Sequence, residues 1–288
     1  MTRRRTVTAY LFLLPNLIAF VAFMAVPFGW VLWLSFNRGG ILGAPQFVGL
    51  HNWTGIFHDP IAVTAVENTF LYTLMAVPSV FAIALFLALM LQRIRRLGGL
   101  FRSALYFPTL MPVVLAALAW TFVISPDFGF VNIVLRSAHL PVINWLGSGF
   151  LALVTITGLE VWRGIGFWTV LFLAALLGIP EEYYEAARID GAGQWSLFRR
   201  VTLPLLRPTF LFAIVIATIL NLQIFNAVYT LTDGGPVYGT ATIVWYIYQS
   251  MFVFNRPGYG AALSFMLMVV TMVLSLVELR ILRRSINA

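Results

Sequence analysis

The chain has 288 residues, of which 61% are hydrophobic and only 10% are charged, and its mean hydropathy is +0.92. This composition leaves too little polar surface to cover a water-soluble globule, so it predicts an all-α protein embedded in lipid. The formal net charge is +8, and all 18 basic residues are arginine. Because there is no lysine, the chain lacks a Gly-x-x-x-x-Gly-Lys phosphate loop, and we do not expect it to hydrolyse ATP.

Residues that commonly carry catalysis or hold metals are scarce. The chain has no cysteine, and its three histidines, His51, His58 and His139, are scattered over loops. We therefore expect no catalytic site, no metal site and no cofactor. The arginines fall in short clusters between long apolar runs rather than along a polar helix, which argues against nucleic-acid binding.

A helix needs about 20 apolar residues to cross the hydrocarbon core of a bilayer. Windows of that length predict a polytopic protein with six transmembrane helices in one domain, residues 1–288. The first window is too long for the core of a signal peptide, so we expect this helix to be retained. The windows cover about residues 10–34, 70–91, 104–124, 150–177, 209–231 and 259–276.

The arginines cluster at alternate ends of the predicted helices, which sets the orientation of the chain. They precede the first helix, separate the second from the third and the fourth from the fifth, and follow the sixth. Translocation of positive charge is disfavoured, so these loops and both termini are predicted to be cytoplasmic. The predicted external segments are residues 37–68, 125–149 and 232–258, which contain only Arg38, Arg136 and Arg256.

Two further features lie near the middle of the chain. In the second external segment, apolar residues from Val131 to Leu135 lie beside Asp127, Asn132 and Arg136, which suggests a short interfacial helix. Within the fourth predicted transmembrane helix, Glu160 and Arg163 are spaced i, i+3 and can pair on one face. A charge in the bilayer interior costs about 2.5 to 3.5 kcal/mol, so both must face protein or water. They form either a structural ion pair or part of a gate or pathway.

The cytoplasmic segment 178–207 has its own helical signals. Pro180 suits the first turn of a helix, and the acidic residues that follow it complement the positive N-terminus. Gly191 can take the left-handed conformation that ends this helix. A second short helix is predicted over about residues 194–201, with Pro204 stopping it. Two short helices joined at a glycine, with carboxylates and arginines on them, favour a docking element for a soluble partner.

The fifth predicted helix carries polar and aromatic residues at helical spacing. Thr218, Asn221, Phe225 and Tyr229 would share one face, with Asn226 at its flank. Amides among aromatic rings suit a hydroxyl-rich solute, because amides hydrogen-bond hydroxyls and rings stack on sugars. This face either lines a solute path or packs in the bundle, with Asn221 bonding across a helix interface.

The cytoplasmic segment also carries a recognisable signature. Glu185-Ala186-Ala187, three residues, Gly191, nine residues and then Val201-Thr202-Leu203-Pro204 resembles the Glu-Ala-Ala signature of binding-protein-dependent ABC importer permeases. The one departure is Val201, where the pattern usually has isoleucine. Four segments of the chain resemble the carbohydrate-uptake branch of this family, namely residues 180–208, 161–163, 231–236 and 258–262.

The resemblance implies an ABC importer permease fold in a bacterial or archaeal plasma membrane. It implies a second six-helix permease, two ATPase subunits on separate chains, an extracellular or periplasmic solute-binding protein, and a sugar or polyol as solute. An alternative for Arg199 and Arg200 is that they only set the topology of the chain through the positive-inside rule. The residues implied in the ATPase contact are Glu185, Ala186, Ala187, Asp190, Gly191, Trp195, Arg199, Arg200 and Pro204.

The alternative from another functional class is a secondary transporter of a small polar solute. Such a protein would show an inverted repeat with broken helices at corresponding positions. No such internal symmetry is visible in the sequence, so the importer permease is the favoured interpretation.

Overall fold

The computed structural model describes residues 2–39, 43–94 and 97–286, and these are helical over most of their length. The chain divides into two compact units, Met1–Val63 with Tyr246–Met268, and Thr64–Trp245 with Val269–Ala288. The arginine pattern that predicts the topology includes Arg95 and Arg96 and the side chains of Arg3, Arg4, Arg5, Arg283 and Arg284, which lie outside the described residues.

The first unit begins with an almost continuous helix, made of α1 (Thr2–Phe20), a π turn η1 (Val21–Ala25) and α2 (Val26–Ser35). The unit also contains the short strands β1 (Asn37–Arg38) and β2 (Gln46–Phe47), α3 (His51–Ile56), the π turn η3 (Gln249–Val253) and the start of α15 (Pro257–Ile286). The two strands pair antiparallel, with Asn37 opposite Phe47.

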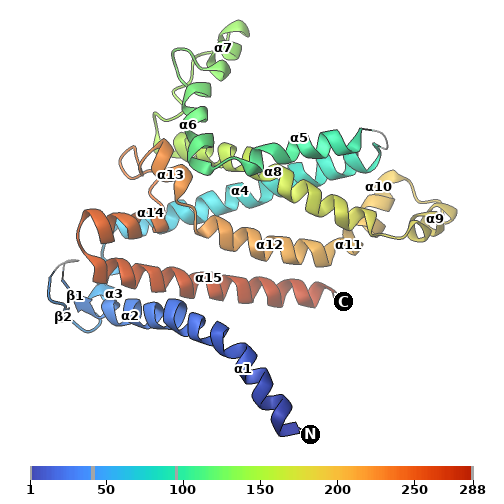
Figure 1. Cartoon of the computed structure of the whole chain (residues 1–288). Coiled ribbons are helices and arrows are strands. Elements are labelled where there is room, and N and C mark those ends of the chain that lie inside the picture. Colours follow the sequence, from blue (N-terminus) through green and yellow to red (C-terminus); the bar gives the residue numbers. More distant parts are fainter. Residues whose placement is uncertain (1, 40–42, 95–96, 287–288) are drawn as a thin grey trace. The chain divides into compact units, whose positions relative to one another are not determined.

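The second unit holds most of the remaining helices (Figure 1). They are α4 (Pro60–Gln92), α5 (Gly98–Leu110), α6 (Val113–Val123), α7 (Phe130–Ser137), α8 (Gly149–Leu177), α9 (Glu181–Ile189), α10 (Gln194–Leu197), η2 (Phe198–Thr202), α11 (Leu203–Leu205), α12 (Arg207–Leu222), α13 (Asn226–Leu231) and α14 (Ile243–Tyr248). The start of α4, up to Val63, and the end of α14, from Tyr246, belong to the first unit.

Four helices of the described chain are long and apolar enough to cross a membrane, and there are up to six if each of two bent pairs counts as one span. The four are Tyr10–Ser35, Pro60–Gln92, Gly149–Leu177 and Pro257–Ile281. The bent pairs are Gly98–Leu110 with Val113–Val123, at 98°, and Gln194–Leu205 with Arg207–Leu222, at 63°.

Two predicted helices are broken in the structure. The predicted helix 104–124 is wrong as one element, because α5 ends at Leu110 and α6 begins at Val113. Met111 is extended, with φ −72° and ψ 132°, since it precedes Pro112, whose ring disfavours the α conformation in the residue before it.

The predicted helix 209–231 is also interrupted, because α12 ends at Leu222 and α13 begins at Asn226. The break is stabilised from a distant segment, since the Thr242 hydroxyl donates to the carbonyl of Ile224 at 3.1 Å. An interrupted helix needs such a partner for the carbonyls it frees.

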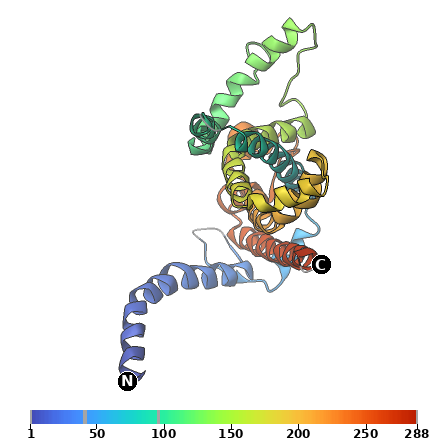
Figure 2. The same ribbon diagram turned by 90° about the vertical axis from the view of Figure 1, so that its right-hand side faces the viewer.

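The core of the second unit forms where α4, α8 and α12 pack together, and Figures 1 and 2 show α5 running beside α8. Phe172 of α8 packs against both Phe81 of α4 and Phe210 of α12, with ring centroids 5.4 Å and 4.8 Å away. Gly166 of α8 lets α5 approach closely, because a Cβ there would collide with the carbonyl of Leu105.

The short helix predicted in the second external segment is present as α7. Asn132 is fully buried, and its amide donates to the carbonyls of Ser125 and Ile143 at 3.1 and 3.0 Å. This side chain therefore ties α7 to the chain on both sides of it.

Candidate functional site

The segment between α8 and α12 folds as its local signals predict. Pro180 is the N-cap residue of α9, with Glu181 and Glu182 in the first turn. Gly191 has φ +80°, and the helix ends in a Schellman motif, with Gly191 N–H donating to Arg188 O and Ala192 N–H to Ala187 O, at 3.0 and 2.9 Å. The left-handed conformation predicted for Gly191 is confirmed.

The second helix of this segment runs further than predicted. Helical backbone continues through η2 to Leu205, so Pro204 does not stop it. Proline has no N–H to donate to the carbonyl four residues earlier, and the chain passes this point through a π turn, in which Leu203 N–H bonds to Phe198 O. The Tyr184 hydroxyl lies 3.1 Å from the Thr202 hydroxyl and joins the two helices of the segment.

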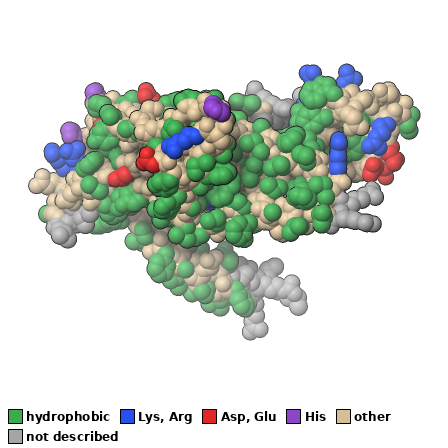
Figure 3. Space-filling model, turned by 90° about the horizontal axis from the view of Figure 1, so that it is seen from above, with side chains coloured by type: hydrophobic (Ala, Val, Ile, Leu, Met, Phe, Trp, Pro, Cys, Tyr) green, Lys and Arg blue, Asp and Glu red, His purple; other side chains and the backbone are tan. Residues whose placement is uncertain are grey.

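The tip of this segment exposes both charged and apolar side chains. Ile189 is 86% exposed and Trp195 is 72% exposed, although both are large and hydrophobic. Figure 3 shows acidic and arginine side chains gathered over the part of the molecule formed by α9 and α10. The predicted contact residues Glu185, Ala186, Asp190, Gly191, Arg199 and Arg200 are all exposed, and Ala187 and Pro204 are partly buried.

Ile189 was absent from the sequence prediction. The available signal was a large apolar residue in the last turn of a short helix that is otherwise rich in charged residues. Exposed apolar side chains rimmed by charges are typical of a protein interaction surface.

A second candidate site is a cavity of about 380 Å³ inside the second unit. Side chains of α4, α8 and the α12–α13 break line it, together with residues of α5 and α6. The polar residues of its lining are Tyr72, Thr109, Glu160, Arg163, Asn221, Gln223 and Asn226.

The predicted ion pair lies in the wall of this cavity. Arg163 donates to Glu160 Oε2 from Nη2 at 2.9 Å and from Nε at 3.2 Å. The two side chains are 25% and 16% exposed, so they face the cavity rather than being sealed in the bundle. The Thr109 hydroxyl donates to the backbone carbonyl of Arg163 at 2.7 Å and fixes α5 to this turn of α8.

The residues predicted to share one face of the fifth helix are only partly brought together. Asn221, Phe225 and Asn226 line the cavity, whereas Tyr229 does not, although its ring stacks on Phe225 with centroids 5.3 Å apart. The continuous face is wrong because the helix ends at Leu222. The break instead turns Phe225 and Asn226 into the cavity.

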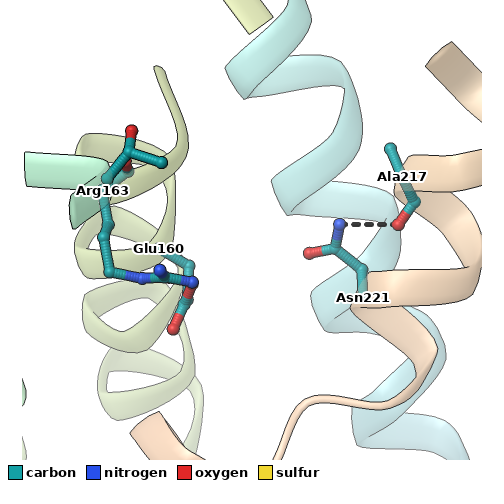
Figure 4. A network of polar contacts seen from close by, with 5 residues as sticks. Glu160, Arg163, Ala217 and Asn221 are labelled. Atoms are coloured by element: carbon teal, nitrogen blue, oxygen red, sulfur yellow. Dashed lines mark hydrogen bonds and ion pairs between the residues drawn. The ribbon is translucent and has the colours of Figure 1, made fainter. Parts of the chain in front are cut away.

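Figure 4 shows Glu160 and Arg163 on α8 and Asn221 on α12, with the carbonyl oxygen of the Asn221 amide turned towards α8. The nitrogen of that amide donates to Ala217 O at 2.8 Å, within α12. This bond therefore does not cross a helix interface. The structure combines two features that the sequence presented separately, the ion pair and the amides.

Glu278 is a partly buried carboxylate that the sequence prediction missed, because the sixth predicted helix ends at about residue 276. The Thr218 hydroxyl donates to Glu278 Oε1 at 2.8 Å, which links α12 to α15, and Thr218 does not line the cavity. The sequence signal that could have identified Glu278 is its position directly after the apolar stretch of the sixth predicted helix.

The chain matches known proteins over most of its length. Residues 62–286 match the family described as "Binding-protein-dependent transport system inner membrane component". The chain belongs to this family. The permease is 34% identical over 277 residues to the sulfoquinovosyl glycerol transport system permease protein SmoG of Agrobacterium fabrum, covering 96% of the permease and 90% of SmoG. It is 34% identical over 280 residues to the lactose transport system permease protein LacF of Rhizobium radiobacter, covering 94% and 93% of the two chains.

A solved structure gives the same result for the fold. A chain of the bacterial alginate ABC transporter, crystallised with an alginate pentasaccharide-bound periplasmic protein, superposes with a TM-score of 0.87 and 25% identity, covering 99% of the permease and 97% of that chain. The resemblance drawn from the Glu-Ala-Ala signature is confirmed. The permease is the membrane subunit of an ATP-binding-cassette importer and a multi-pass protein of the plasma membrane.

Proposed function

We propose that the permease acts as one transmembrane domain and forms half of the path for a sugar or related polyol. An extracellular solute-binding protein delivers this solute, a second permease completes the path, and ATPase subunits on separate chains drive it. Relatives named for lactose and sulfoquinovosyl glycerol transport support a solute rich in hydroxyl groups.

The observation that carries the proposed path is the cavity of about 380 Å³. Its wall combines the Glu160–Arg163 pair with the amides of Asn221 and Asn226 and the ring of Phe225. Carboxylate, guanidinium and amide groups hydrogen-bond hydroxyls, while an aromatic ring offers an apolar face to a sugar ring. Pockets that bind small solutes commonly have about this size, with few polar groups at fixed positions.

The proposed coupling element is the segment from α9 to α11. Ile189 and Trp195 would anchor in the ATPase subunit, since large exposed apolar side chains supply most of the contact energy at an interface. Glu185, Arg199 and Arg200 would surround these anchors and fix their orientation. The Schellman motif holds the angle between the two short helices and so transmits movement of the partner to α12.

Reconstitution in proteoliposomes tests the proposal. Uptake of radiolabelled sugars should require internal ATP, the ATPase subunits and external binding protein together. Omission of each component in turn is the control. Uptake by the permease alone, driven by a sodium or proton gradient, would instead establish a secondary transporter.

A further inference from the structure

The first unit contains a separate cavity of about 980 Å³ to which the proposed path assigns no role. Its lining comes from β1, α3, the start of α4 and the turn before α15. These segments belong to residues 37–68 and 232–258, which the arginine distribution predicts to be external. A ligand of this cavity would therefore arrive from outside the cell.

The acidic residue that lines the cavity, Asp59, already has hydrogen-bond donors for both of its oxygens. Asp59 Oδ2 accepts hydrogen bonds from the hydroxyls of Tyr246 and Tyr259 at 2.5 and 2.7 Å. Asp59 Oδ1 caps α4 by accepting from Ile61 N–H at 2.9 Å and Ala62 N–H at 3.4 Å. Burial raises the pKa of Asp59, but these hydrogen bonds outweigh it and lower the pKa below its usual value. The carboxylate stays charged and has no free acceptor for a cation.

The backbone beside two arginines of the cavity lining, Arg38 and Arg256, is held in place by hydrogen bonds and close packing. The Asn52 amide donates to the carbonyls of Ser35 and Asn37 at 2.9 Å each, which fixes the chain directly before Arg38. Gly258 packs against the carbonyl of Asn37 so closely that a Cβ would collide with it, and Arg256 lies two residues before this glycine. The backbones that carry Arg38 and Arg256 are thus fixed against each other.

The charge of the mouth is unbalanced. Arg38 and Arg256 are exposed, and within the described chain neither forms an ion pair. His51 and His58 also line the cavity, and Asp59 is its one acidic residue. Guanidinium groups bind carboxylates through two parallel hydrogen bonds, so the mouth suits an anionic partner.

We propose that this cavity is a contact site for acidic side chains of the extracellular solute-binding protein, an inference that rests on the proposed function. A free sugar acid fits less well, because exposed ion pairs contribute little on their own. Within a protein interface the same guanidinium groups lose water, speed the encounter and fix the register of the partner. The volume of about 980 Å³ is also far more than a single small anion fills.

The test uses the complete importer in lipid nanodiscs with its own solute-binding protein. Stimulation is measured against the concentration of binding protein for Arg38→Gln, Arg256→Gln and the double variant. Arg136→Gln is the matched control, because Arg136 is also exposed in a predicted external segment but does not line the cavity. Assembly is checked by copurification of the ATPase subunits.

The half-saturating concentration should rise at least about fivefold in the double variant, with the maximal rate unchanged and the salt dependence reduced. Arg136→Gln should behave as wild type. Equal half-saturating concentrations in wild type and double variant would overturn this inference alone. Inhibition by free galacturonate beyond that of equal chloride would overturn it in favour of a sugar-acid site. A wild-type complex that binding protein does not stimulate would refute the proposed function as well.

Discussion

Replacement of Gly191 by valine tests the coupling segment with little steric interference. Gly191 has φ +80°, and a Cβ at this position would have no heavy atom within 4 Å. The effect of a side chain is therefore backbone strain, about 1 to 3 kcal/mol for a residue held in this region. The strain would depopulate the Schellman motif about five- to 150-fold and change the angle between α9 and α10.

Gly193 supplies the matched control. It lies in the same turn, a Cβ there would also meet nothing within 4 Å, and its backbone is extended, with φ −73° and ψ 169°. Valine readily adopts extended backbone conformations, so Gly193→Val should add no comparable strain. Gly191→Asn should retain most function, because asparagine tolerates the left-handed conformation.

The assay is binding-protein-stimulated ATPase activity and uptake in proteoliposomes, at equal amounts of inserted permease. Gly191→Val should lose most of both while the permease still inserts, and Gly193→Val should keep them. Normal coupled activity in Gly191→Val would refute the reasoning, as would an equal loss in both valine variants.

Three further predictions concern the orientation of the chain, the cavity lining and the Glu160–Arg163 pair. A single cysteine at Trp195 should react with an impermeant maleimide only in inside-out vesicles, and labelling of intact cells would overturn the predicted orientation. Asn221→Ala should change uptake rate or solute preference in an assembled complex, whereas Tyr229→Phe, outside the cavity lining, should not; unchanged uptake in Asn221→Ala would remove this side chain from the path. Glu160→Gln should cost about 2 kcal/mol of stability because it leaves Arg163 unpaired, and Arg163→Gln in the same chain should recover part of the melting temperature of the purified permease.

The sequence alone determined the features that depend on neighbours along the chain. Composition specified a membrane protein, and the longest charge-poor window, 150–177, matches α8 to within one residue. Pro180 and Gly191 placed the start and end of α9, because capping and left-handed turns need only local residues. The Glu-Ala-Ala spacing specified the family for the same reason.

Tertiary structure decided where distant segments meet. The end of α12 at Leu222 could not be predicted from hydropathy, because the hydroxyl of the distant Thr242 stabilises that break. Asn221 and Asn226 join the Glu160–Arg163 pair only because packing of α4, α8 and α12 leaves a cavity there. Likewise, Asp59 meets Tyr246 across 187 residues. Window hydropathy and helical periodicity describe one segment at a time, whereas these sites are made by side chains from several segments, so their positions follow from packing.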